Sequence, residues 1–387
     1  MANNMLPIDR EHGRCVVLAI GEGTVRGLRT VTRLLRFTGV AALTVALDVG
    51  ASCQSAQSSG GRQHDSDSRT AGLLNADERQ RVIEELLTNL KRYYVYPELA
   101  AKMADTVLIH AKSGEYDRVT DGQTLADLLT QELKEVSHDA HLRMLYSSVK
   151  RPHRQVTPGP PPPPPPELVA RYRKEMEESN CTFEKVQILP NNVGYLKLNS
   201  FPDPSICGVT AAAMMAKLNQ AEAIIFDLRE NGGGSPGMVA LLATYLFDHP
   251  THLTDFYNRA ENSTQESWTL QPVPGNSLAD KPAYVLTSAS TFSGAEEFAY
   301  DLKMLKRATV VGETTRGGAH LVRSYPVNDH FEIAIPSARP INPISKTDWE
   351  GTGVEPNVKA TAGTALTTAE KLAERELSKK PSRQSQR

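Results

Sequence analysis

The sequence predicts an α/β fold preceded by a small helical subdomain. In the C-terminal half, continuous apolar runs alternate with amphipathic stretches, which is the order of buried parallel strands and crossover helices. Before them, residues 75–147 place apolar side chains at three- and four-residue steps, as helices do. A proline-rich segment separates the two regions, since nine of the 25 prolines fall between Pro152 and Pro166.

Composition excludes several classes of protein. The chain has 387 residues, of which 40% are apolar, so it can fill a core and is neither collagen-like nor wholly disordered. Lys and Arg are balanced by Asp and Glu, with a formal net charge of −2, which gives no case for nucleic-acid binding.

Residues 1–70 resemble an export leader followed by a polar linker. A basic region precedes the short apolar run 38–47, and small residues follow at 50–53. The run is too short to span a bilayer as a stable helix. In a lipoprotein-type signal Cys53 would be acylated and would attach the protein to a membrane. We therefore expect an exported protein, periplasmic or membrane-anchored; the alternative is a frayed N-terminal tail.

The four cysteines do not have the spacing of a zinc site, and we expect no metal or cofactor. If the leader is removed or anchored, Cys181 and Cys207 remain in the folded part. They either pair in an oxidising compartment or stay as two buried thiols.

Residues 71–150 are expected to form the helical subdomain. Asn75 and Glu78 have the spacing of a capping box at the start of the first helix. A second helix opens after Pro97, and a third covers 125–136. A short strand is expected at 142–146.

Residues 151–178 are expected to be a proline-rich spacer followed by a helix. Polyproline is extended and stiff, so a spacer is favoured over a docking site for a proline-recognising partner.

Residues 179–365 carry the strand and helix alternation, and residues 366–387 read as a polar tail. Strands are expected at 193–198, 223–228, 283–287 and 309–312. Helices are expected at 209–218, 238–247 and 295–305.

Three loops follow buried strands, which is where α/β folds place ligands. The glycines of loop 227–235 could expose N–H groups to an oxyanion or a phosphate, or could simply form a flexible turn. No GK[ST] follows, which argues against a nucleotide P-loop. In the second loop, Ser293 lies at a helix N-terminus; it is either a nucleophile or an N-cap paired with Glu296. The third loop, residues 312–320, ends at His320, which is either a catalytic or a structural histidine.

Together these segments resemble the C-terminal-processing (tail-specific) serine peptidases, in the branch that contains the interphotoreceptor retinoid-binding protein and the tricorn protease core. The matching pieces are Gly194-Tyr195-Leu196, Asp227-Leu228-Arg229 with the following glycines, Ser293-Gly294-Ala295-Glu296, Gly312-Glu313-Thr314 and Gly353-Val354-Glu355-Pro356. The resemblance implies a core of the Clp protease/crotonase type, and the chain has no room for an inserted PDZ domain.

The resemblance also implies roles for single residues. Ser293 falls on the nucleophile, and the N–H groups of Gly294 and Gly233 would form the oxyanion hole. The lysine base of some relatives is absent, since no lysine lies between Lys306 and Lys346. The base would then be a histidine, with His141 the best match.

Other assignments stay open. His138 and His320 are the alternative bases, and Glu296 or Glu350 would orient the base. These roles describe a serine peptidase that hydrolyses peptide or protein substrates through an acyl-enzyme. The alternative is a non-catalytic protein that binds retinoid- or lipid-type ligands on the same fold.

Overall fold

The structure is a computed structural model that describes residues 74–151, 164–273 and 275–379. The expected leader with Cys53, most of the proline run and the last residues of the tail lie outside the described residues. Among the described residues, no helix combines the length and apolarity needed to cross a membrane.

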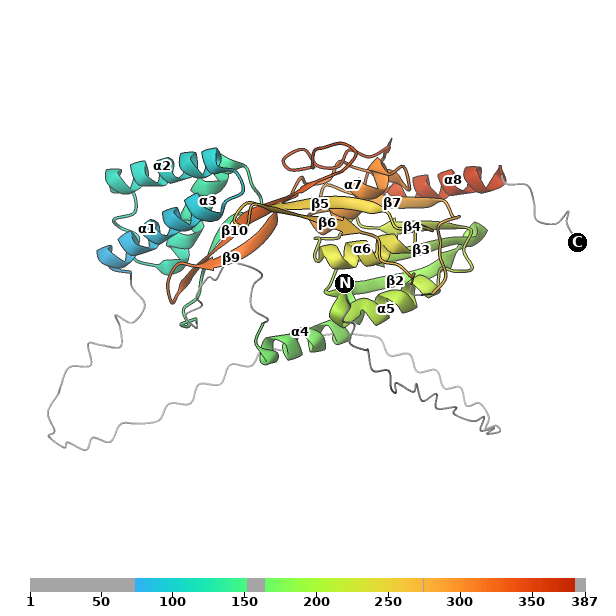
Figure 1. Cartoon of the computed structure of the whole chain (residues 1–387), viewed down its shortest axis with the longest axis horizontal. Coiled ribbons are helices and arrows are strands. Elements are labelled where there is room, and N and C mark those ends of the chain that lie inside the picture. Colours follow the sequence, from blue (N-terminus) through green and yellow to red (C-terminus); the bar gives the residue numbers. More distant parts are fainter. Residues whose placement is uncertain (1–73, 152–163, 274, 380–387) are drawn as a thin grey trace, which may run out of the picture. The chain divides into compact units, whose positions relative to one another are not determined.

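The described chain contains helices and strands in the following order (Figure 1). They are α1 (Ala76–Tyr93), α2 (Pro97–Ser113), α3 (Gly122–Ser137), β1 (Arg143–Tyr146), α4 (Pro166–Glu178), η1 (Asn180–Thr182), β2 (Phe183–Leu189), η2 (Pro190–Asn192), β3 (Val193–Leu198), α5 (Pro204–Ala216), β4 (Ala223–Asp227), α6 (Pro236–Thr244), β5 (His252–Asn258), β6 (Ser263–Trp268), β7 (Ala283–Thr287), α7 (Gly294–Met304), β8 (Thr309–Gly312), β9 (Leu321–Pro326), β10 (Phe331–Ile341), β11 (Val358–Lys359) and α8 (Ala365–Ser378).

A six-stranded sheet confirms the predicted α/β class. Its order is β11-β8-β7-β4-β3-β2, and every neighbouring pair is parallel except β2 with β3. The four predicted strands of the core are β3, β4, β7 and β8, which lie side by side in the middle of this sheet. Because the central strands are parallel, the loops that follow β4, β7 and β8 emerge at one edge of the sheet.

The two faces of this sheet are covered by different helices. Alternate residues of the strands, such as Phe226 and Val285, pack with side chains of α5, α6 and α7. Their neighbours Ile225 and Tyr284 face the opposite way and pack against α8.

Helix α8 differs from the expected polar tail. Residues 366–378 belong to this helix, which buries Ala365, Ala369 and Ala373 against the sheet. The three alanines are four residues apart and so share one face. Small side chains on an otherwise charged helix gave too weak an apolar pattern for prediction.

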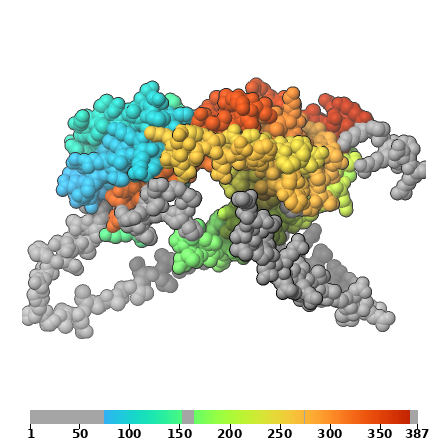
Figure 2. All heavy atoms as spheres, viewed as in Figure 1, coloured from blue at the N-terminus to red at the C-terminus, as the bar shows by residue number. Residues whose placement is uncertain are grey.

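The three N-terminal helices form as predicted, and the capping box of Asn75 and Glu78 is present at the start of α1. Their core is completed by residues from far along the chain. Tyr325 of β9 and Phe331 and Ile333 of β10 are buried among the helices, and Figure 2 shows the orange β9–β10 residues against the blue helical ones. The helical subdomain is therefore not purely N-terminal.

Strands β9 and β10 belong to a second sheet that the sequence did not indicate. Its order is β1-β10-β5-β6, with β9 also paired to β10, and all its pairs are antiparallel. The long strand β10 joins β1 of the helical subdomain to β5 of the core.

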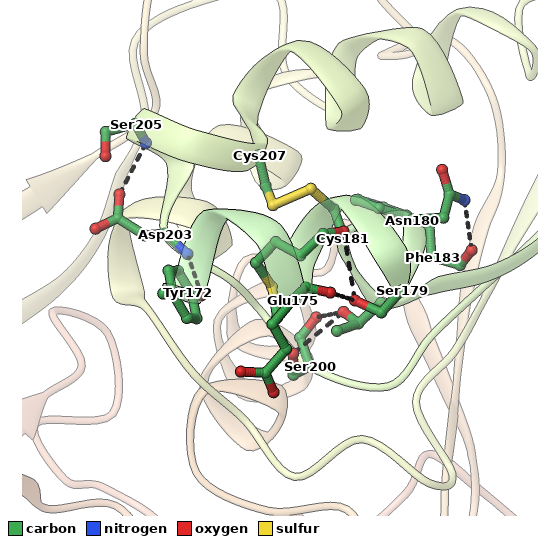
Figure 3. The surroundings of a disulfide bond; sticks show 12 residues. Tyr172, Glu175, Ser179, Asn180, Cys181, Phe183, Ser200, Asp203, Ser205 and Cys207 are labelled. Carbon is green, nitrogen blue, oxygen red and sulfur yellow. Dashed lines mark hydrogen bonds between the residues drawn. A yellow bond between two sulfur atoms is a disulfide. The ribbon is translucent and has the colours of Figure 1, made fainter. Parts of the chain in front are cut away.

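Cys181 and Cys207 form a disulfide, which decides between the two alternatives left by the sequence (Figure 3). The bond ties η1 to α5, and both residues are buried in the core on the same face of the parallel sheet.

Candidate active site

Ser293 lies in the sharp turn between β7 and α7. It is the N-cap of α7 and forms a capping box with Glu296, but its backbone has φ 55° and ψ −123°. N-cap residues ordinarily have extended backbone, and a side chain at positive φ is strained. Such strain is found where a functional group must be held in a fixed direction. Capping alone does not account for this conformation.

The glycine loop after β4 lies directly against Ser293. Gly233 has φ 96°, and a Cβ at this position would stand 2.6 Å from the Ser293 Cβ. Gly234 has φ 141°, and its Cβ would meet the carbonyl oxygen of Phe201 at 2.1 Å. Only glycine permits this approach.

The two predicted oxyanion donors, the N–H groups of Gly233 and Gly294, differ in whether they already have an acceptor. The Gly233 N–H donates to the Asn231 Oδ1 at 2.8 Å, so this donor is already occupied. Neither the Gly234 nor the Gly294 N–H has an acceptor among the described residues. The two groups are neighbours, since a Cβ on Gly294 would be 3.1 Å from the Gly234 nitrogen. Next to the Gly294 N–H, the unoccupied N–H of this loop is therefore that of Gly234 and not that of Gly233.

His141, at the end of the loop that leads into β1, lies beside the turn that contains Ser293. Its ring stacks on that of Phe292, the residue before Ser293, with centroids 4.5 Å apart. A Cβ on Gly318 would stand 2.8 Å from His141 Cε1, so the missing side chain makes room for the ring.

The surroundings of His141 favour the neutral imidazole. Burial lowers its pKa to about 4, although the Asp139 carboxylate acts in the opposite direction. Within the described residues neither ring nitrogen has a hydrogen-bond partner. The ring is therefore uncharged near pH 7 and free to accept a proton.

Asp139 is a site residue that the sequence reasoning missed. Its buried carboxylate accepts the His141 N–H at 3.0 Å, the Tyr94 hydroxyl at 3.1 Å and His320 Nδ1 at 2.6 Å. Burial alone would raise its pKa, but the hydrogen bond and charge of His320 outweigh burial and lower it. The available signal was the spacing Asp139-x-His141, which suits an aspartate that accepts the N–H two residues on.

His320, one of the alternative bases, lies beside His141 in this cluster. Its Nδ1 faces Asp139, its Nε2 is buried without a partner among the described residues, and its ring is edge-on to Tyr96. Burial opposes the charged ring, but the hydrogen bond and charge of Asp139 prevail and raise its pKa.

His138, the other alternative, ends α3. It is the C-cap residue in the left-handed region, with φ 56°, and its N–H donates to the Lys134 carbonyl at 2.8 Å. Its side chain is exposed, and its backbone ends the helix, which is the structural role of a C-cap residue.

The Glu296 carboxylate is hydrogen-bonded both to the turn that contains Ser293 and to the loop that contains Gly317 and Gly318. It is wholly buried and accepts hydrogen bonds from Ser293 N, Thr315 Oγ1, Gly317 N and Gly318 N. Burial raises its pKa, and these hydrogen bonds act against that rise. Its oxygens thus face backbone and hydroxyl donors of the loops rather than a histidine.

Glu350, the other expected carboxylate, lies next to a histidine. Its Oε2 accepts Ala319 N at 2.6 Å and His320 N at 3.3 Å, and is 3.5 Å from His320 Nδ1. Burial is the main cause that raises its pKa to about 7. Asp139 is closer than Glu350 to His320 Nδ1, at 2.6 Å against 3.5 Å, and its Oδ1 lies 4.0 Å from His141 Nδ1.

Asp139, His320 and Glu350 also form a group that could hold a metal ion, with ligand atoms within 4.8 Å of one another. Two ligands of a tetrahedral zinc ion lie roughly 3.4 Å apart, whereas Asp139 Oδ2 and His320 Nδ1 are 2.6 Å apart. The present arrangement is that of a hydrogen-bonded pair.

Comparisons with known proteins match two adjoining parts of the chain to family models. Residues 192–360 match the model of peptidase family S41, and residues 75–190 match the N-terminal domain of that family in eukaryotic IRBP. A carboxyl-terminal-processing protease from Synechocystis is 30% identical over 148 residues, which are 38% of this chain and 33% of that protein. The chloroplastic carboxyl-terminal-processing peptidase 2 of Arabidopsis thaliana is 29% identical over 166 residues, 43% of this chain and 31% of that protein.

The fold has counterparts among solved structures. A protein from Parabacteroides merdae described as a candidate peptidase superposes with a TM-score of 0.54 at 17% identity, over 76% of this chain and 96% of that one. The chain spans about a third of the length of the curated relatives named above. Because the two family models adjoin and cover the helical subdomain and the sheet that carries Ser293, residues 75–360 belong to peptidase family S41.

Proposed function

We propose that the protein is a serine peptidase that hydrolyses peptide bonds through an acyl-enzyme on Ser293. The observation that carries the proposal is the strained backbone of Ser293, at a helix N-terminus and against two free glycine N–H groups. Membership of family S41, and relatives named as carboxyl-terminal-processing proteases, support the same activity.

In the proposed reaction the Ser293 hydroxyl attacks the carbonyl carbon of the scissile bond and gives its proton to His141. The resulting oxyanion accepts hydrogen bonds from Gly234 N and Gly294 N, which need no reorganisation because the loops already hold them. The protonated His141 then donates to the leaving amine. Water repeats the attack on the ester with His141 again as base, and the acid product leaves.

Asp139 and His320 support the base in this scheme. Asp139 fixes the backbone of His141 through the 3.0 Å hydrogen bond, and its charge favours the imidazolium that forms during the reaction. His320 holds the second oxygen of Asp139 and so limits its rotation. Glu296 keeps the loop of Gly317 and Gly318 against the turn of Ser293.

Labelling by a serine-directed fluorophosphonate tests the nucleophile. We expect the purified protein to be labelled on Ser293 and to cleave peptides, and we expect Ser293→Ala to lose both properties. Ser290→Ala is the matched control, since Ser290 is an exposed serine of the same loop. Full peptidase activity in Ser293→Ala would refute the assignment. A folded wild-type protein that is not labelled and binds retinoid or lipid tightly would instead be a carrier.

We further propose that the protein is exported. The disulfide between Cys181 and Cys207 supports this location, because disulfides persist in oxidising compartments. Fractionation of cells that express the full chain tests the proposal. Recovery with the periplasm or membranes is expected, and attachment through Cys53 predicts that Cys53→Ser releases the protein from membranes. Recovery in the cytosol would contradict export.

A further inference from the structure

The helical subdomain holds a group of metal-ligand side chains outside the proposed active site. His110 lies in the last turn of α2, Glu115 in the turn that follows, and Glu132 on α3. One ligand atom from each residue lies within 4.8 Å of the other two. The sequence alone predicts no metal here, because the three residues come from two helices and the turn between them rather than from one motif.

The end of α2 places Glu115 against His110. The helix ends at Gly114, which adopts the left-handed conformation with φ 80°. The chain therefore turns back, and the Glu115 N–H donates to the His110 carbonyl at 3.1 Å. Glu132 approaches from α3, where it is one of the buried residues of that helix. Two carboxylates from different elements thus reach one imidazole.

The distances around the His110 ring are those of ligands that share one small ion. Its Nδ1 is 3.2 Å from the Glu132 Oε1 and 3.8 Å from the Glu115 Oε2. These values lie on either side of the roughly 3.4 Å that separates two ligands of a tetrahedral zinc ion. The Nδ1 atom is buried, yet it has no hydrogen-bond partner among the residues that the structure describes. This nitrogen is therefore close to two carboxylate oxygens without bonding to either, as a ligand of a shared ion is.

Each of the two carboxylates is oriented by a hydroxyl group. Ser113 Oγ donates to the Glu115 Oε1 at 3.0 Å, and the Tyr116 hydroxyl donates to the Glu132 Oε2 at 2.5 Å. In both residues the remaining oxygen is the one beside His110 Nδ1. Ligating carboxylates of metal sites are held by outer hydrogen bonds of this kind. In the described part of the chain no lysine or arginine forms an ion pair with Glu115 or Glu132, so their negative charges match a divalent cation.

We propose that His110, Glu115 and Glu132 bind one Zn²⁺ ion, which joins the end of α2 to α3. Imidazole and carboxylate groups are both ligands that zinc accepts. The fourth position of the ion is open to water, since the Glu115 side chain is 53% exposed and that of His110 is 31% exposed. The site shares no residue with the proposed active site, so the inference does not depend on the peptidase function.

Zinc binding to the full-length protein tests the site. The protein is purified without a histidine tag, stripped of metal with a chelator, and dialysed against buffered free Zn²⁺, and the bound metal is counted. We expect one tight site per chain and a Tm that rises with the Zn²⁺ concentration, because the ion binds the folded state.

Variants of the ligands and of their hydroxyl partners should weaken binding to different degrees. Loss of an outer hydrogen bond lowers metal affinity by roughly 10–100-fold, which is the effect expected for Tyr116→Phe. A larger loss is expected for His110→Gln and Glu132→Gln, which remove ligands. Because Glu115 is exposed, Glu115→Gln removes a ligand without disturbing the core, and it should also weaken zinc binding. Circular dichroism without metal checks the fold of each variant.

His252→Gln is the matched control. His252 is a partly exposed histidine whose Nε2 is 2.7 Å from Oδ1 of a single carboxylate, Asp255, and it belongs to neither group of metal-type ligands found in the described chain. Its loss should leave zinc binding and the rise in Tm unchanged.

Two results would overturn the proposal. One is tight zinc binding that survives in His110→Gln, Glu115→Gln and Glu132→Gln; if it is lost in His320→Gln instead, the ion belongs to the group around Asp139. The other is a folded wild-type protein that binds no zinc, which would leave His110 as an ordinary ion-pair partner of two glutamates.

Discussion

The largely buried His141 sets how the proposed activity depends on pH. A base must be unprotonated, so activity is lost as pH falls through its pKa. Because burial lowers the pKa of His141 to about 4, we expect kcat/KM to stay high from pH 7 down to pH 5 and to fall near pH 4. An unperturbed histidine would lose activity near pH ~6.5. A pH profile of peptide hydrolysis, with Tm measured at each pH, checks this.

Neighbouring histidines provide the control for this profile. His141→Gln should lower kcat by roughly a hundredfold or more, whereas His138→Gln should retain activity, since His138 is an exposed helix-terminal residue. An acid limb near pH 7 would contradict the assignment of His141. It would point to Glu350, whose pKa is raised to about 7.

Asp139 shows why single residues of the site were hard to predict. The sequence places Asp139 two residues from His141, which suggests local backbone bonding and nothing more. Its contacts with Tyr94 and His320 join segments 45 and 181 residues away. No local pattern encodes such contacts, so only the fold reveals the carboxylate that both histidines share.

The proposed oxyanion donor in the loop after β4 is the Gly234 N–H, and its position depends on the conformation of the loop backbone. A Cβ on Gly234 would stand 2.1 Å from a carbonyl oxygen of Phe201, so Gly234→Ala must move the loop. We expect Gly234→Ala to lower kcat/KM by about 10²–10³, the effect of losing one oxyanion donor. The measurement is single-turnover acylation of Ser293, with the fold checked by circular dichroism.

Gly232→Ala is the matched control in the same loop. A Cβ on Gly232 meets nothing within 4 Å and its φ is not in the left-handed region, so acylation should change little. Equal loss in both variants would show that the whole loop is fragile and that Gly234 has no special role. If Gly234→Ala acylates normally, its N–H is not the donor.

Elements were predictable where the apolar pattern is local. The strands β3, β4, β7 and β8 are continuous apolar runs, and α1 and α3 have clear apolar stripes, so these strands and helices could be predicted from the sequence. The antiparallel sheet was not predicted. Strand β6 is almost wholly exposed, and β9 and β10 derive their burial from helices more than 180 residues earlier in the chain.

The same long-range contact brings together residues from before and after the proline-rich segment. His141 precedes the proline-rich residues and Ser293 follows them, yet both lie at one site because β1 pairs with β10. The helical subdomain and the parallel sheet are thus parts of one structural unit that carries the proposed site.

The stability of this unit should depend on two acidic residues buried behind Ser293. Glu297 and Asp301 lie one turn apart on α7, and each has a side-chain oxygen without a partner among the described residues. Burial raises the pKa of Glu297 to about 8 and also raises that of Asp301. The folded state therefore holds protons that the unfolded state, with a Glu pKa of about 4.3, has released.

Because the folded state binds more protons in this range, the free energy of unfolding should decrease as pH rises from about 4.5 to about 8. Glu297→Gln keeps the shape and removes the charge, so it should flatten this slope and stabilise the fold at pH 8 by an amount on the order of a few kcal/mol. Urea unfolding at pH 5 and pH 8 measures both effects, and Glu85→Gln, an exposed change on α1, should leave the slope as it is. A variant that keeps the wild-type slope would show that the pair is ionised in the folded protein.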